Sequence, residues 1–157
     1  MTAARPVIVM ESPLGPDLAL LMARHTADMH ADTPPESIHM MDAGQLAIPS
    51  VAFYVMRLGG EPLAMGAFKT FAPAQAEIKS MHVLAEHRGK GLSRLMLDHL
   101  LAEALQAGLT SVSLETGSQD MFEPARRLYL RAAFKECAPF ADYRLDPNSV
   151  YMTRTLA

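Results

Sequence analysis

Residues Met81–Arg94 read MHVLAEHRGKGLSR and are the most informative segment of the chain. An apolar strand leads through a short loop to two glycines, and a helical pattern starts directly after them. Glycines let the backbone turn tightly and let a ligand approach the N–H groups. The N-terminus of a helix adds free N–H donors and a partial positive charge. The segment therefore predicts an anion site suited to phosphate, with further positive charge from Arg88, Lys90 and Arg94.

Two better-known glycine motifs do not fit this segment. A P-loop requires G-x-x-x-x-G-K-[ST], which the sequence does not supply. A dinucleotide-binding fingerprint requires G-x-G-x-x-G, and Arg94 stands at the third glycine position. The segment also follows a predicted meander of strands and does not lie in an opening β-α-β unit. At this point the open alternative is a glycine-containing loop with solvated basic residues.

Hydrophobic periodicity on either side of the segment predicts one sheet with helices. Strands are predicted at 7–11, 51–58, 63–71, 76–84, 112–115, 134–137 and 150–155, and helices at 14–30, 92–107 and 123–132. Residues 31–37 are predicted to form a surface loop. The helix at 92–107 has an apolar stripe of Leu92, Leu95, Met96, Leu100, Ala104 and Leu105. Elements mixed in this order indicate the α/β (α+β) class with a largely antiparallel sheet.

Composition limits the classes of function. The chain has 157 residues, half of them hydrophobic, which suits one domain spanning residues 1–157. The net charge is −3 without a basic block, so no nucleic-acid partner is expected. No apolar run approaches the roughly 18 residues that span a bilayer, and residues 1–10 lack the apolar core of an export signal. With one cysteine and no disulfide, the sequence predicts a soluble cytoplasmic protein without a membrane partner.

A narrower pattern is carried by EIKSMHV at 77–83, RGKGLS at 88–93 and ARRLYLRAAF at 125–134. RGKGLS resembles the [QR]-x-x-G-x-[GA] pyrophosphate loop of the GNAT N-acetyltransferase superfamily, with Ser93 as the last small residue. EIKSMHV resembles the strand before that loop. ARRLYLRAAF resembles the later A-x-x-L-Y-x-x-x-G-F motif, with Ala133 in place of glycine. The resemblance implies the GNAT fold over the whole chain, which is a mixed, mostly antiparallel sheet of about seven strands flanked by helices, with a V-shaped splay between the two central strands.

The resemblance also implies acetyl-CoA as co-substrate, without a metal. Pantetheine would bond the backbone of the strand at 77–83, and the pyrophosphate would lie on the N–H groups of the turn. The residues expected to contact acetyl-CoA are Met81, His82, Val83, Arg88, Gly89, Lys90, Gly91, Leu92, Ser93, Arg94, Ala125 and Tyr129. The histidines of the chain show no H-E-x-x-H spacing or cysteine pairing, so no metal site is predicted.

The implied reaction is direct attack of a small-molecule primary amine on the thioester. An alkyl amine has a pKa near 10, so its deprotonation at neutral pH costs roughly 4 kcal/mol without assistance. Glu77 matches the position of the catalytic glutamate in many GNAT enzymes, and Glu115 on the facing strand or a water is the competing base. The alternative for Glu77 is an exposed strand-end carboxylate paired with Lys79. Tyr129 matches the tyrosine that protonates the leaving thiolate, and its alternative is a core aromatic residue.

The acceptor side is less specific. The resemblance places Ser37, His39, Glu115, Phe122, Asp142 and Tyr143 near the mouth of the pocket as substrate-binding candidates. Two alternatives stay open, a protein lysine or N-terminal acetyltransferase and a non-catalytic acyl-CoA-binding module. Because GNAT proteins often dimerise, the resemblance also implies a homodimer.

Overall fold

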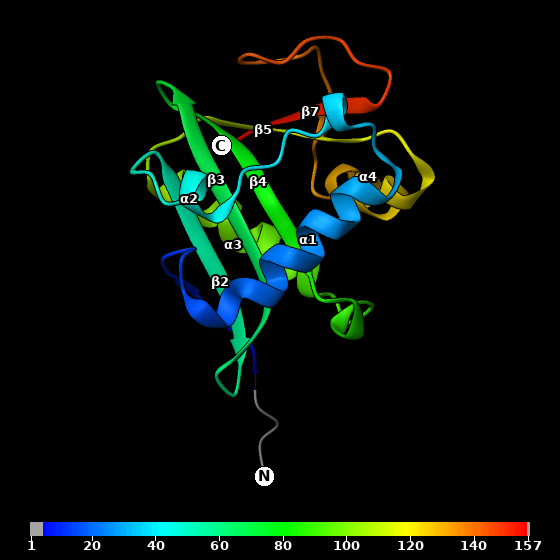
Figure 1. The fold of residues 1–157 in the computed structure, drawn as a ribbon. Helices are drawn as coiled ribbons and strands as arrows, with labels where there is room; N and C mark the ends of the chain where they lie inside the picture. Colours follow the sequence, from blue (N-terminus) through cyan, green and yellow to red (C-terminus); the bar gives the residue numbers. More distant parts are fainter. Residues whose placement is uncertain (1–4, 157) are drawn as a thin grey trace.

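The chain folds into a seven-stranded sheet with helices on both faces, and the computed structural model describes residues 5–156. The strand order is β1-β2-β3-β4-β5-β7-β6, and α1 and α3 lie on opposite faces of the sheet (Figure 1). The strands are β1 (Val7–Met10), β2 (Val51–Leu58), β3 (Glu61–Ala72), β4 (Gln75–Val83), β5 (Ser111–Gly117), β6 (Lys135–Glu136) and β7 (Ser149–Thr155). The helices are α1 (Ala19–Asp32), α2 (Ala43–Leu46), α3 (Leu92–Gln106) and α4 (Glu123–Arg131). The predicted class and strand count are confirmed.

Strands β4 and β5 form the parallel pair of this sheet. Their register joins Gln75–Glu77 to Ser111–Ser113. Beyond these residues, β4 continues to Val83 and β5 to Gly117 without pairing to each other. Unpaired strand edges leave N–H and C=O groups free for another partner. This opening is the predicted V-shaped splay, which is confirmed.

Alternate residues of the central strands face the two helical layers. On β2, Tyr54 packs in the cluster with α3, whereas Phe53 packs in the cluster with α1 and α2. The approach of α3 to β3 requires a glycine at position 66, because a Cβ there would lie 2.9 Å from Met96 Cγ.

The buried face of α3 differs from the predicted stripe. Leu92, Met96, Leu100 and Ala104 are buried as predicted, together with Leu97 and Leu101. The other two members of the predicted stripe, Leu95 and Leu105, are 50% and 47% exposed. Single apolar side chains are common on protein surfaces, so hydrophobicity alone does not fix the edges of a helical stripe.

Residues 31–37 form the predicted surface loop only in part. α1 continues to Asp32, and a 3₁₀ turn follows at Pro35–Ser37. Ser37 is 3% exposed because it packs beneath the segment that holds Asp146, to which its hydroxyl donates at 2.5 Å. Helix α2 was not predicted, although Asp42 and Gln45 have the spacing of the capping box that starts it.

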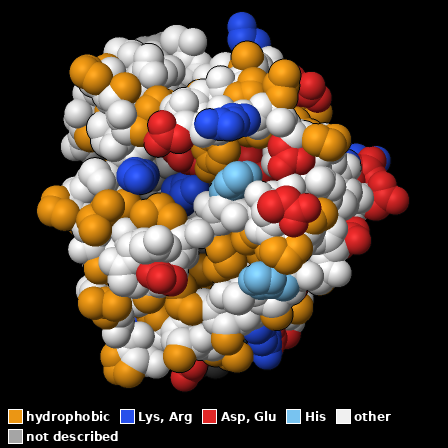
Figure 2. All heavy atoms as spheres, turned by 45° about the horizontal axis from the view of Figure 1, so that its top comes forward, with side chains coloured by type: hydrophobic (Ala, Val, Ile, Leu, Met, Phe, Trp, Pro, Cys, Tyr) orange, Lys and Arg blue, Asp and Glu red, His pale blue; other side chains and the backbone are white. Residues whose placement is uncertain are grey.

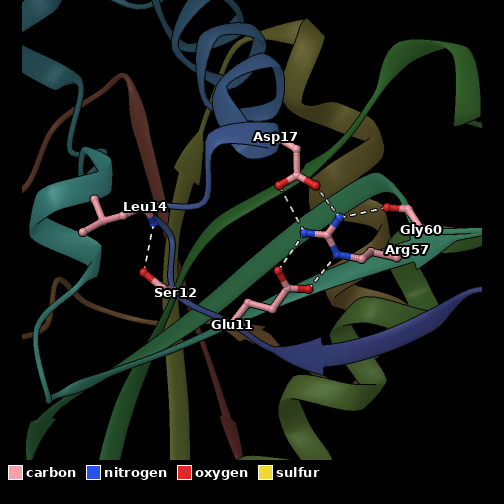
Figure 3. Close-up of polar contacts among 6 residues, drawn as sticks. All are labelled: Glu11, Ser12, Leu14, Asp17, Arg57 and Gly60. Atoms are coloured by element: carbon pink, nitrogen blue, oxygen red, sulfur yellow. Dashed lines mark hydrogen bonds and ion pairs between the residues drawn. The ribbon is translucent and has the colours of Figure 1, made fainter.

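Arg57 on β2 connects the N-terminal segment to the sheet (Figure 3). Its guanidinium donates to both carboxylate oxygens of Glu11 at 2.7 Å and to Asp17 at 2.6 Å. It also donates to the Gly60 carbonyl in the β2–β3 turn at 2.9 Å. The bonds to Glu11, and next those to Asp17, raise the pKa of Arg57 above its usual range. These four residues are called the Arg57 cluster below.

Two predictions extend beyond the described residues. The domain limits 1–157 and the lack of an export signal in residues 1–10 both involve residues 1–4, which lie outside them. Within residues 5–156, every helix is too short or too polar to cross a membrane.

Candidate active site

A cavity of about 580 Å³ opens between the splayed ends of β4 and β5, and it is called the first cavity. Its walls come from β4, the turn before α3, β5 and α4. It brings together the predicted residues His39, Glu77, Met81, His82, Val83, Arg88, Gly89, Gly91, Leu92, Ser93, Arg94, Glu115, Phe122, Ala125, Tyr129 and Tyr143. Of the other predicted residues, Lys90, Ser37 and Asp142 do not line it.

The turn before α3 presents backbone donors to the first cavity. Gly89 and Gly91 have φ values of 80° and 77°, which residues with a side chain rarely adopt. The first hydrogen bond of α3 runs from the Leu95 N–H to the Gly91 carbonyl at 3.2 Å. The N–H groups of residues 92–94 therefore have no partner within the helix. This geometry suits an anion at the helix N-terminus.

The arginines of the turn already have protein partners. Arg88 donates to the Val83 carbonyl at 3.0 Å and to Asp28 on α1 at 2.9 Å. Arg94 donates to Asp98, one helical turn later, at 2.9 Å. The anion site therefore depends on backbone N–H groups more than the sequence suggested. Arg88 ties α1 to the turn, a positioning role that no local motif indicates.

Helix α4 carries Tyr129 to the first cavity. Ala125 and Tyr129 are four residues apart, so they share a helix face, and both line the cavity. Burial, followed by the charge of Glu115, raises the pKa of Tyr129 to about 12. Arg126 fixes the start of α4 against β5 by donating to the Gly117 carbonyl at 2.7 Å. Tyr129 is thus a buried, protonated hydroxyl beside the splay.

Glu115 reaches the first cavity from β5. Burial raises the pKa of its carboxyl to about 6, while a hydrogen bond from the Ser149 hydroxyl at 2.8 Å partly opposes the rise. A carboxylate with a pKa near 6 accepts protons more readily than an ordinary glutamate. Ser149 lies next to the 142–148 segment, and nothing in the sequence indicated its contact with Glu115.

Glu77 reaches the first cavity from β4 in different surroundings. It is 6% exposed, so the interpretation of an exposed carboxylate is wrong, whereas its pairing with Lys79 is confirmed at 3.3 Å. The Tyr143 hydroxyl also donates to it, and burial together with the charge of Glu77 raises the pKa of Tyr143 above its usual range. Lys79 further donates to the His39 carbonyl at 2.9 Å. The i, i+2 spacing on one strand was the sequence signal for the pairing of Glu77 and Lys79.

A second cavity of about 740 Å³ lies on the other side of Glu77, Lys79 and Tyr143. Both cavities are lined by His39, Met40, Glu77, Lys79 and Tyr143, which are called the shared wall. Figure 2 shows this end of the molecule, where basic, acidic and histidine side chains surround a hollow. Asp142 lines the second cavity, while Ser37 lines neither cavity and donates to Asp146, which lines the second.

Two histidines lie on the α1 side of the first cavity. Burial lowers the pKa of His25 to about 4, and burial lowers the pKa of His82 as well. Their ring centroids are 5.4 Å apart, and both rings are neutral at pH 7. Within residues 5–156, no group of three His, Cys, Asp or Glu side chains is arranged to hold a metal ion.

Comparisons with known proteins agree with this architecture. The model of the acetyltransferase (GNAT) family matches residues 21–134. The chain is 41% identical over 149 residues to the uncharacterized N-acetyltransferase YsnE of Bacillus subtilis, covering 95% of this chain and 99% of that protein. It is 33% identical over 154 residues to the IAA acetyltransferase of Azospirillum brasilense, covering 95% and 97%. The solved structure of an acetyltransferase from Streptococcus agalactiae matches the fold with a TM-score of 0.77 at 18% identity, over 96% and 98% of the two chains. The chain therefore belongs to the GNAT family of N-acetyltransferases, enzymes that use acetyl-CoA as the acetyl donor.

Proposed function

We propose that the protein transfers an acetyl group from acetyl-CoA to a primary amine of a small molecule by direct attack on the thioester. The observation that carries this proposal is the presence of Tyr129 and Glu115 on one cavity. The pKa of Tyr129 is about 12 and that of Glu115 about 6, so one holds a proton and the other accepts one. Environments that push two pKa values apart in this way mark an acid and a base.

Acetyl-CoA fits the turn before α3 and the open edge of β4. The pyrophosphate suits the free N–H groups at the start of α3 and the two positive-φ glycines. The backbone of β4 beyond Glu77 has no β5 partner, so the amides of pantetheine bond to it as an added strand would. Met81, His82 and Val83 supply these groups, and an N–H at His82 or Val83 polarises the thioester carbonyl.

Glu115 suits the general base better than Glu77. Glu77 already accepts hydrogen bonds from Tyr143 and Lys79, which stabilise its charged form. Glu115 has the raised pKa of about 6 and faces the same cavity. We assign proton removal from the amine to Glu115, directly or through a water, and positioning of the shared wall to Glu77. This reverses the ranking that the family resemblance suggested.

Tyr129 is assigned to the leaving group. Its hydroxyl keeps its proton at neutral pH, because burial raises its pKa to about 12. The departing sulfur carries the negative charge of the reaction, and a buried hydroxyl stabilises that charge and returns a proton to it. The amine proton thus goes to Glu115 and the thiolate receives its proton from Tyr129.

The walls of the second cavity favour a small acceptor. Two segments that are distant in sequence, 36–48 and 141–146, form much of these walls. The Ser37 hydroxyl joins them through Asp146 at 2.5 Å, and His39 packs edge-on against Tyr143 with ring centroids 5.0 Å apart. A protein acceptor needs an open groove for an extended chain, whereas the contacts between these two segments close off part of the second cavity.

The test is release of CoA thiol from acetyl-CoA with a panel of primary amines and a panel of peptides bearing free N-termini or lysines. We expect release that requires a free small amine and exceeds the rate of amine-free hydrolysis. Release with peptides alone would indicate a protein acetyltransferase. Tight acetyl-CoA binding without release on either panel would indicate a non-catalytic module.

On family resemblance alone, we expect the protein to be a homodimer and to be located in the cytoplasm. Size-exclusion chromatography with light scattering tests the dimer, and cell fractionation tests the location. A monomer would leave the proposed chemistry unchanged, because every residue assigned above belongs to one chain.

A further inference from the structure

The second cavity carries more positive than negative charge on its strand face. Lys69 on β3 lies directly opposite Glu77 on β4 in the sheet register. Residues at opposite positions, and residues two apart on a strand, share one face of a sheet. Lys69, Glu77 and Lys79 therefore project together, and all three line the second cavity. Two ammonium groups there face one carboxylate.

Lys79 and Lys69 differ in the number of hydrogen bonds and ion pairs that their ammonium groups make. Lys79 has an 11% exposed side chain and uses its three donors on Glu77 at 3.3 Å, Tyr143 at 3.2 Å and the His39 carbonyl at 2.9 Å. Lys69 is half-buried, yet within residues 5–156 its ammonium has neither an ion pair nor a hydrogen bond. A half-buried ammonium without a protein partner can bind an anionic ligand by a charge-assisted hydrogen bond.

Within residues 5–156, none of the four carboxylates that line the second cavity, Glu36, Glu77, Asp142 and Asp146, forms an ion pair with Lys69. Asp146 already accepts hydrogen bonds from two side chains. Glu36 and Asp142 are exposed, where water and salt screen their charges. Arg144 adds a further exposed cation to the lining. An anionic group is therefore the ligand that this side of the second cavity suits.

We propose that the acceptor is an amine that also bears a carboxylate, and that Lys69 binds this carboxylate in the second cavity. The inference rests on the proposed function, because the amine must reach Glu115 across the shared wall. The apolar residues of the lining are Met40, Met41, Ile48, Phe71 and Leu145. They suit the apolar side chain of an α-amino acid, whose amine and carboxylate are both bonded to one carbon. The substrate class is thus an amino acid with an apolar side chain, and not a polyamine, whose charges Lys69 would repel.

The test compares L-phenylalanine, L-phenylalaninamide and 2-phenylethylamine, which share the ring and the primary amine. Lys69→Met keeps an unbranched side chain, one atom shorter, and removes its charge. We expect it to lower kcat/KM for L-phenylalanine by about tenfold to a hundredfold, with kcat/KM for the other two amines and the KM of acetyl-CoA unchanged. Comparing each amine between wild type and variant cancels the differences in amine pKa. Lys135→Met, on exposed β6 and away from both cavities, is the control.

A second readout does not depend on turnover. Isothermal titration of L-phenylalanine into the CoA-saturated protein is expected to show about tenfold weaker binding in Lys69→Met than in wild type. Equal losses for all three amines would make Lys69 structural and overturn the inference. Acetylation of the amines without any advantage for the carboxylate would overturn it and leave the proposed function standing. A wild type that neither binds nor acetylates any free amine would overturn both.

Discussion

Strands β4 and β5 each place one carboxylate on the first cavity, and the two are held in opposite ways. Glu77 on β4 is 6% exposed, with the Lys79 ammonium 3.3 Å away and the Tyr143 hydroxyl donating to it. Glu115 on β5 accepts a hydrogen bond from Ser149, and burial raises its pKa to about 6. Glu77 thus has two protein donors, whereas burial of Glu115 opposes its charge.

This difference separates a structural carboxylate from a reactive one. Glu77 already accepts hydrogen bonds from the Lys79 ammonium and the Tyr143 hydroxyl, which hold it in the shared wall. A carboxylate buried against its charge costs folding free energy, which natural proteins retain where function requires it. Glu77 therefore organises the shared wall, and Glu115 is poised to accept a proton from the amine.

The largest expected effect tests Tyr129, the acid that lines the same cavity as both carboxylates. Tyr129→Phe should lower kcat about 10²- to 10³-fold, because the buried hydroxyl that protonates the leaving sulfur is lost. Steady-state thiol release measures it, with Tyr54→Phe, in the core beside α3, as the matched control. Unchanged kcat in Tyr129→Phe would leave the departing thiolate to water and remove the acid from the mechanism.

The next effect separates the two carboxylates by their pH dependence. Glu115 must be deprotonated to act, so kcat/KM of the wild type should fall as pH drops through about 6. Glu115→Gln should lower kcat/KM about a hundredfold at pH 7.5 and abolish this acidic limb. Glu77→Gln should keep the limb. If the limb vanished in Glu77→Gln and persisted in Glu115→Gln, the roles assigned to β4 and β5 would be exchanged.

The cofactor end of this site could be predicted because its information is local. Gly89 and Gly91 adopt the positive φ values that the turn needs, and Ala125 and Tyr129 meet the cavity through helical spacing alone. The turn at Ala133 shows that local substitutions are tolerated, since this alanine takes a φ of 69° where the family motif has glycine. Backbone conformation and short spacings are properties that a single sequence displays directly.

The acceptor end could not be predicted, since segments far apart in the sequence assemble it. Ser37 and Asp142 were both expected at the mouth of one pocket, yet Ser37 is buried against Asp146, 109 residues away, and Asp142 faces the second cavity. The burial that raises the pKa of Glu115 likewise depends on tertiary packing. Periodicity identifies the face on which a side chain lies but not its neighbours across the fold.

Replacing Glu115 and replacing Glu77 should change the free energy of unfolding in opposite directions. Burial raises the pKa of Glu115 from 4.5 to about 6, so its charge destabilises the fold above pH 6 and has no effect below pH 4.5. Glu115→Gln should therefore raise the free energy of unfolding by up to about 2 kcal/mol at pH 7.5, and the gain should disappear as pH falls towards 4.5. Glu77→Gln should lower it by about 2 kcal/mol at pH 7.5, because Lys79 loses its counter-charge. Urea titration at several pH values measures both, and changes of the same sign would contradict the comparison.

The smallest expected effect measures how much an ion pair outside both cavities contributes to stability and to kcat/KM. The Arg57 cluster lines neither cavity, and the side chain of Arg57 is 22% exposed, so Arg57→Met should cost about 1 kcal/mol of unfolding free energy. Its kcat/KM should stay within about twofold of wild type, because 1 kcal/mol of stability leaves the folded population almost unchanged. Arg57→Lys is the matched variant, since it keeps the charge and loses the bidentate bond to Glu11. A large loss of kcat/KM in Arg57→Met would mean that stability and activity are coupled across the sheet, and losses at Glu77 would then no longer separate a structural carboxylate from a catalytic one.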